Sequence, residues 1–373
     1  MIEPRTVEEF TAYLEDCDRQ VSHSALSVEH ASKASEYLKR IEASRYIRQN
    51  LQMRTAGILG RTLSANGQRD QARTVFEEAK GRSASPSERA SLAIRLARFY
   101  TEEGDWANAL SEAECAVKHF CGHRPQYETD LRSAAGALVA RGNVYFLAMI
   151  DEAAISGESD LFHRAEIDYR AALLCASHRT EISAIAATTN LACLALRSWW
   201  ATGHRKIPPA SIAKEMKRVC RLLRKKGIRY NSRAHAVARW LYGLASVEAY
   251  GSLNRSDENR LQRAFLDLLD LGAIQDAAKL ALDLSYCYLR ENRSDDSLGT
   301  TDTVLCHSTA GRLPKEWRDA LLVWREAIEQ RQVSSAIART FKVIRGFHIV
   351  WNRPERVEIP KSRFGDRSDT MGL

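Results

Sequence analysis

The sequence predicts an all-α protein built as a solenoid of antiparallel helix pairs. Between Ala90 and Ala116, small and apolar residues recur at helical spacing on both sides of Gly104-Asp105, as expected for two short helices joined by a tight turn. The same spacing stands 37 residues earlier, again with small residues where two helices would cross. A pair of this kind cannot bury its apolar face alone, so it must stack on neighbouring pairs.

The two copies align at seven positions, four of which are identical. The first copy contributes Leu59, Gly60, Leu63, Gly67, Ala72, Phe76 and Ala79; the second contributes Leu96, Ala97, Tyr100, Gly104, Ala109, Ala113 and Ala116. On these residues the chain resembles the tetratricopeptide repeat (TPR) family over residues 53–123, with Pro86 closing the first unit. The resemblance implies a right-handed superhelical solenoid of TPR-like antiparallel helix pairs.

Further pairs follow with altered loops. The third places Gly142 and Tyr145 on its first helix and Ala165, Tyr169 and Ala172 on its second, with an insertion at Asp151–Asp160 between them. Later units are expected to open at Asn190–Ala192, Arg239–Tyr250 and Ala277–Leu289, and a last pair at Pro314–Gln330 and Val333–Arg345.

The N-terminal region precedes the first clear repeat. Thr6 and Glu9 form a capping box that opens a short helix, and a second helix is expected over Ser24–Gln49. We therefore predict three parts. They are a helical cap or small bundle at 1–50, the TPR-like solenoid at 51–346, and an extended basic and apolar tail at 347–373.

Composition agrees with a helical protein of a reducing compartment. The chain has only 8 Pro and 19 Gly in 373 residues, and no apolar run reaches the roughly 18 residues that would cross a bilayer. No signal peptide is evident at the start. The eight cysteines lie mostly within helical patterns, as small buried apolar residues do. We expect a cytoplasmic protein without membrane contact.

Positive charge is concentrated between Gly203 and Arg233, which hold eleven Lys or Arg and one acidic residue, whereas the whole chain has a net charge of +8. A helix is expected from Ser211 to Lys226, with an apolar stripe at Ile212, Met216, Val219, Cys220 and Leu223. Its other face carries Lys214, Lys217, Arg218, Arg221, Arg224 and Lys225. Three interpretations remain open for this basic helix: a solvated outer face, contact with nucleic acid, or contact with an acidic protein.

In the TPR family, first-helix residues that face away from the packing positions line a concave peptide groove. The resemblance carries this role to Arg54, Arg61, Ile94, Arg95, Arg98, Asn143, Asn190 and Arg197. Arginine can grip carboxylates or phosphates with its planar fork, and asparagine can bond a peptide backbone in both directions. The alternative is that these arginines solubilise the inner face or pair with Glu102 and Glu103.

Catalytic and metal sites find little support. Cys115, His119, Cys121 and His123 have soft-ligand spacing, but this segment resembles the end of a packed helix. Cys175 and His178 lie in a similar position, and no phosphate-binding glycine loop occurs. We expect no catalytic residues, no bound metal and no cofactor.

The sequence favours a non-enzymatic adaptor or regulator that binds a protein or peptide partner, with an acidic segment as one candidate. Two alternatives remain: a regulator that binds nucleic acid through the basic helix at 203–233, and a TPR-type peptide-sensing regulator. Homo-oligomerisation is left open.

Overall fold

The computed structural model describes residues 3–22, 28–83, 85–122, 128–151, 160–176, 182–202, 207–225, 233–333, 340 and 344. Every regular element in these ranges is helical. The first half contains α1 (Val7–Ser22), α2 (Val28–Arg40), α3 (Arg45–Ala65), α4 (Arg69–Arg82), α5 (Pro86–Glu103), α6 (Trp106–Cys121), α7 (Glu128–Asp151) and α8 (Asp160–Cys175). The second half contains α9 (Ile182–Thr202), α10 (Pro209–Lys225), α11 (Arg233–Tyr250), α12 (Arg255–Asp270), α13 (Ile274–Arg290), α14 (Ser294–Leu305), the 3-10 turn η1 (Ala310–Arg312) and α15 (Lys315–Glu329).

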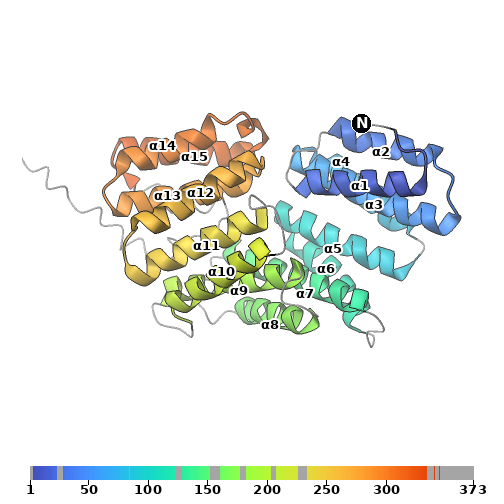
Figure 1. Cartoon of the computed structure of the whole chain (residues 1–373), viewed down its shortest axis with the longest axis horizontal. Helices are drawn as coiled ribbons and strands as arrows, with labels where there is room; N and C mark the ends of the chain where they lie inside the picture. Colours follow the sequence, from blue (N-terminus) through green and yellow to red (C-terminus); the bar gives the residue numbers. More distant parts are fainter. Residues whose placement is uncertain are drawn as a thin grey trace, which may run out of the picture.

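The helices stack as pairs along a curved path (Figure 1). From α3 to α11 the odd-numbered helices contact one another in sequence and form the inner layer, while the even-numbered helices pack behind them. The curvature brings the end of α5 close to the start of α11 in the middle of the molecule (Figure 1). The expected all-α, right-handed superhelical solenoid of TPR-like antiparallel helix pairs is confirmed.

The turns within three of the helix pairs share one backbone conformation. Gly67 and Gly104 both adopt a left-handed φ of 77°, and Asn292 takes the same place after α13 with a φ of 60°. In each turn the next residue donates its backbone N–H to the residue four positions before the left-handed one, which closes the helix end. Those bonds run from Gln68 to Leu63, from Asp105 to Tyr100 and from Arg293 to Tyr288, each at 2.9 Å.

The pair α13–α14 follows the repeat spacing more closely than its sequence suggests. Ser285 and Ser297 lie 12 residues apart and share a hydrogen bond between their hydroxyl groups where the two helices cross. Ala97 and Ala109 hold the same places in α5–α6. The later residues of this unit, Thr301 and Val304, are also fully buried. At this crossing a pair of serines thus replaces the pair of alanines, and the two helices still pack closely.

Glycine occurs at other helix crossings because a Cβ there would collide with a side chain of the facing helix. A Cβ on Gly60 would lie 2.5 Å from the Phe76 ring, and one on Gly142 would lie 2.7 Å from Tyr169. Gly243 meets Leu261 in the same way at 2.7 Å. The expected crossing roles of Gly60 and Gly142 are therefore confirmed.

Two expected helix boundaries are wrong. The single helix over Ser24–Gln49 is two helices, because the chain leaves α2 after Arg40 and Ser44 caps α3 by accepting from the Ile47 N–H at 3.4 Å. The basic helix begins at Pro209 rather than Ser211, since proline suits a first helical turn. Most of the expected helix at Val333–Arg345 lies outside the described residues.

The N-terminal helices share an apolar core with α3. Phe10, Leu14 and Ala34 are fully buried in it, and Leu51 and Ile58 on α3 complete it. The proposed boundary between 1–50 and 51–346 consequently falls inside α3, and we retain the three-part division as a proposal. The tail at 347–373 lies outside the described residues.

Candidate functional site on the inner helices

The inner helices of the second half carry polar or aromatic residues at a constant spacing. Arg233 on α11 contacts Asp276 on α13 across 43 positions, and Trp240 contacts Asp283 across the same 43 positions. Within each helix the two residues are seven positions apart, so they lie on one helix face. The equivalent pairs are Asn190 and Arg197 on α9 and Trp317 and Trp324 on α15.

Among the first residues of these pairs, Asn190, Arg233 and Trp317 are partly exposed, and Asp276 is buried beside Arg233. The Asn190 amide donates to the Asn143 side-chain oxygen at 2.7 Å, and the Tyr169 hydroxyl donates to the same oxygen at 2.8 Å. The Lys279 ammonium lies 5.4 Å from the centre of the Trp317 ring. We call this set the inner polar row; it consists of Asn143, Asn190, Arg233, Asp276, Lys279 and Trp317.

The second residue of each pair is buried beneath that row. The Trp240 indole donates to Asp283 at 2.9 Å, and the Trp324 indole donates to the Ser285 hydroxyl at 2.9 Å. Arg197 lies over the Phe146 ring at 5.2 Å and is only 3% exposed. These buried contacts link α7 to α9, α11 to α13, and α13 to α15. They hold the inner polar row in place.

Burial changes the proton affinity of these deeper groups. It raises the pKa of Asp283 well above that of an ordinary aspartate, although the Trp240 hydrogen bond and Arg197 act in the opposite direction. Burial also lowers the pKa of Arg197 to about 10. The neutral carboxyl form is therefore favoured at Asp283, because the effect of burial exceeds the opposing effects of Trp240 and Arg197.

The end of α5 completes the site. Arg98 and Glu102 on α5 form an ion pair at 3.0 Å and act electrostatically on α11 and α13. The pKa of Arg233 is raised, mainly by Asp276 and further by Glu102. Burial disfavours ionised Asp276, but three cations outweigh it and hold its pKa below the ordinary value. These cations are Arg233, Lys279 and Arg98.

All eight residues predicted to line a groove lie on inner helices. Arg54 and Arg61 are on α3, Ile94, Arg95 and Arg98 on α5, Asn143 on α7, and Asn190 and Arg197 on α9. Their surroundings differ. Arg61 donates to the Gly57 carbonyl at 3.1 Å, and Arg95 packs over Gly57, where an added Cβ would meet it at 2.4 Å. Arg98 forms an ion pair with Glu102 and keeps 58% of its side chain exposed.

Sequence reasoning missed Arg233, Asp276, Lys279 and Trp317. The 43-residue step from Asn190 to Arg233 and on to Asp276 was a usable signal. It was hidden because the residue type changes at every step, from amide to guanidinium to carboxylate.

The basic helix has the two faces that its sequence predicts. Its apolar stripe is buried, and the side chains of Lys214, Lys217, Arg218, Arg221 and Arg224 are exposed on the outer layer of the solenoid. Arg218 approaches Glu215 at 4.0 Å, which is a weak contact between exposed groups. Lys225 ends α10, and its side chain lies outside the described set.

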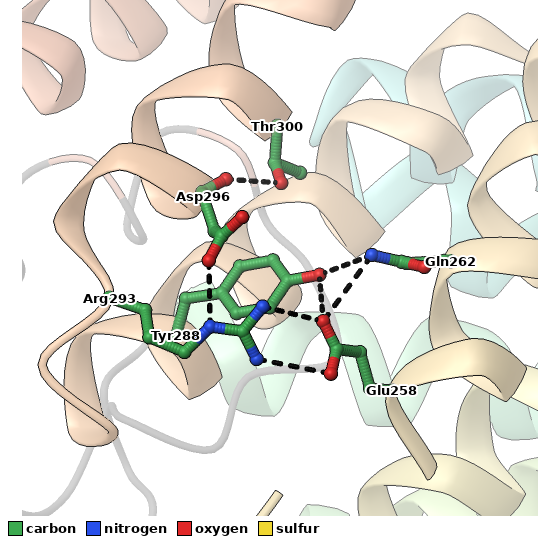
Figure 2. A network of polar contacts seen from close by, with 6 residues as sticks. All are labelled: Glu258, Gln262, Tyr288, Arg293, Asp296 and Thr300. Carbon is green, nitrogen blue, oxygen red and sulfur yellow. Dashed lines mark hydrogen bonds and ion pairs between the residues drawn. The ribbon is translucent and has the colours of Figure 1, made fainter. Parts of the chain in front are cut away.

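A network of polar contacts joins α12, α13 and α14 (Figure 2). Arg293, in the turn after α13, donates twice to Glu258 on α12, at 3.0 and 2.7 Å, and once to Asp296 at 2.7 Å. The Tyr288 hydroxyl donates to Glu258 at 3.2 Å and accepts from Gln262 at 2.7 Å. The network joins α12 to the end of α13 and to the first turn of α14.

The cysteine and histidine residues with metal-ligand spacing do not form a metal site in the described part of the chain. Cys115 and Cys121 are exposed on α6, and His123 and His178 lie outside the described residues. Within those residues no group of three or more His, Cys, Asp or Glu could hold a metal ion. None of the helices described is long and apolar enough to cross a membrane.

Comparison with known proteins supports the architecture. No model of a protein family matches the sequence, and no curated protein matches it either. Among solved structures, a Rap protein complexed with competence and sporulation factor aligns with a TM-score of 0.54 and 11% identity, covering 90% of this chain and 88% of that chain. The fold is a TPR-like helical repeat. At this identity the likeness concerns the fold alone, so function must be argued from the inner polar row and the basic helix.

Proposed function

We propose that this chain is a non-enzymatic TPR-family adaptor or regulator that binds a protein or peptide partner along its inner surface. The inner polar row, completed by Arg98 and Glu102, carries the proposal. It places amide, guanidinium, ammonium, carboxylate and indole groups from separate helices on one surface. A partner that touches several of these groups must span helices that are distant in sequence.

The chemistry of the row suits a polypeptide. Asparagine amides can bond a backbone N–H and C=O together, arginine recognises carboxylates, and a tryptophan supplies a large apolar contact with little entropy to lose. The structurally similar Rap protein was captured with a bound factor, which supports a binding role for this architecture. The eight free cysteines support a cytoplasmic location.

The test compares two matched surfaces of the same full-length chain. The wild type, an inner variant (Arg98→Ala with Lys279→Met) and an outer variant (Lys214→Glu, Lys217→Glu and Arg221→Glu) are immobilised and exposed to nuclease-treated native lysate. Quantitative mass spectrometry should find a defined protein retained by the wild type and the outer variant, and at least tenfold depleted on the inner variant. Equal retention by all three chains would contradict the proposal.

A second candidate function is nucleic-acid binding through α10. It is favoured by five exposed basic side chains on one helix face, with Glu215 as the single acidic residue of that helix. Binding of this kind releases counterions, so its affinity must fall steeply with salt. Fluorescence anisotropy with a labelled duplex at about 50 and 200 mM salt measures this, and the outer variant should reduce the slope of log affinity against log salt by about one unit per lost phosphate contact. A weak affinity that changes little between wild type and outer variant would leave α10 as a solvated face.

A further inference from the structure

We propose that Lys279, Arg233 and Arg98 form a binding site for a single carboxylate group, with Trp317 beside Lys279 as its apolar wall. The site deepens the proposed function, on which it rests for the origin of the carboxylate in a peptide or protein. Its three cations come from α13, α11 and α5. Arg98 on α5 acts electrostatically on Lys279 and on Asp276, the partner of Arg233, although five helices separate α5 from α11 in the chain.

The first argument is the number of unused hydrogen-bond donors. Arg98 contacts Glu102 through Nε, and Arg233 contacts Asp276 through Nε, which leaves the terminal amino groups of both guanidiniums without an acceptor among the described residues. Lys279 contacts the Trp317 ring and has no hydrogen-bond acceptor in the same set. Guanidinium and ammonium groups bind carboxylates with short, charge-assisted hydrogen bonds.

Accessibility is the second argument. The side chain of Arg98 is 58% exposed and that of Arg233 is 43% exposed, while Lys279 and Trp317 are half-buried. A ligand can therefore reach both guanidiniums from solvent and meet Lys279 deeper in the site. Partial burial weakens the competition from water, so a fixed cation attracts an anion more strongly here than on an open surface.

The balance of charge selects the ligand. Arg98, Arg233 and Lys279 are positive, Glu102 and Asp276 are negative, and the group keeps one positive charge. One carboxylate neutralises this group, whereas a phosphate dianion would leave excess negative charge beside two carboxylates. The N-terminal ends of α11, α13 and α15 also lie here, because Arg233, Asp276 and Trp317 are in their first turns. Helix N-termini favour a nearby anion.

The state of the lysine fits the same assignment. Burial lowers the pKa of Lys279, and Arg233 and Arg98 lower it further, whereas Asp276 and Glu102 act in the opposite direction. The three cations therefore repel one another. A bound carboxylate would reduce this repulsion and restore the proton affinity of Lys279.

The assignment is tested on the full chain with small probes and needs no known partner. The indole N–H signal of Trp317, assigned with a Trp317→Phe variant, is followed by NMR during titration. The probes are N-acetylglycine, which has a C-terminal carboxylate; the α-amide of N-acetylglutamate, which has a side-chain carboxylate; N-acetylglycinamide, which is neutral; and inorganic phosphate. We expect saturable shifts with one or both carboxylates and none with the neutral amide. The stronger carboxylate identifies the source as a chain end or an acidic side chain.

Three variants decide whether the proposed residues form the site. Lys279→Met and Arg98→Gln should each weaken carboxylate binding by about 10-fold or more, as loss of a charged hydrogen bond implies. Glu102→Gln should strengthen it, because it removes a competing carboxylate. Lys214→Met on the outer helix should leave it unchanged. Arg98 is largely exposed, so its variant keeps the test valid if Lys279→Met disturbs folding.

Either of two results would overturn the assignment: no saturable shift with any carboxylate up to about 100 mM, or phosphate or the neutral amide binding as well as the carboxylates. The proposed function has a different test. It is contradicted if the inner variant retains the same protein from the lysate as the wild type does. Carboxylate binding without partner binding would preserve the site and remove the adaptor role.

Discussion

The indole nitrogen of Trp240 donates a hydrogen bond to Asp283 at 2.9 Å, and both residues are fully buried. One helical repeat thus supplies the donor and the next supplies the acceptor, deep beneath the surface on which Arg233 meets Asp276. Because both contacts connect the same two helices, the buried pair sets the position of the surface pair. Stability of the fold and geometry of the candidate site are therefore linked through α11 and α13.

Asp283 should make the protein less stable at higher pH. Burial raises its pKa above that of the unfolded chain, which loses this proton near pH 4. The stabilisation from the bound proton is complete below the unfolded value and is lost as pH rises toward the folded pKa. Asp283→Asn keeps a neutral side chain of the same shape, so it should be more stable than wild type at pH 8 and lose this advantage toward pH 4.

Urea unfolding at pH 4.5, 6 and 8 measures this difference. Asp270→Asn, at an exposed position of α12, is the control and should show no such pH-dependent gain. A constant stability difference between Asp283→Asn and wild type across this range would contradict the prediction.

Gly60→Ala should destabilise the first repeat. Its Cβ would lie 2.5 Å from the Phe76 ring, and the shifts needed to accommodate such an added methyl group typically destabilise a packed core by about 1–3 kcal/mol. Gly81→Ala on α4 is the matched control, because nothing lies within 4 Å of its added Cβ and alanine favours a helix by up to about 1 kcal/mol. Thermal unfolding should lower the Tm of the first variant and maintain or raise that of the second. Equal shifts would show that the crossing tolerates a methyl group.

Ser285→Ala should cost more than Ser297→Ala. Ser285 bonds Ser297 and also accepts from the Trp324 indole, so its loss removes two buried hydrogen bonds, at a cost of about 1–3 kcal/mol. Ser297→Ala removes only the hydroxyl pair. A double-mutant cycle by chemical denaturation measures the coupling of the two serines. Strictly additive effects would show that the hydroxyl pair contributes nothing.

Arg293→Lys should loosen the joint between α12 and α13. A lysine cannot reproduce the two-pronged contact with Glu258, although it keeps the charge. The hydrogen bonds from Arg293 lower the pKa of Glu258 against the opposing effect of its burial, so their stabilisation is present at neutral pH and is lost as pH falls through the folded pKa. Hydrogen exchange at pH 7 should increase in α13 and α14 and remain unchanged in α5 and α6. Arg255→Lys on α12 provides the control, since that residue donates no hydrogen bond to Glu258.

The repeats that sequence alone revealed are those whose crossing residues keep their type. Ala97 and Ala109, and Gly60 with Phe76, are recognisable as a pattern because small residues are required wherever two helices approach closely. A unit was expected to open at Ala277–Leu289, but its repeat-like crossing was not recognised, because Ser285 and Ser297 meet the same steric demand with hydroxyl groups that bond each other. The break between α2 and α3 was missed because residues 41–44 extend a helical apolar pattern, although α2 ends at Arg40 and Ser44 caps the start of α3.

The amino-acid sequence by itself determined the helical repeat, its glycine turns and the two faces of the basic helix. Each depends on residues close in the chain, through helical periodicity, left-handed turns or local charge. Tertiary structure alone decided which inner residues reach solvent. Arg197 is buried while Arg233 is partly exposed, and Arg98 on α5 acts electrostatically on Lys279 on α13, because these relations depend on superhelical curvature summed over several repeats.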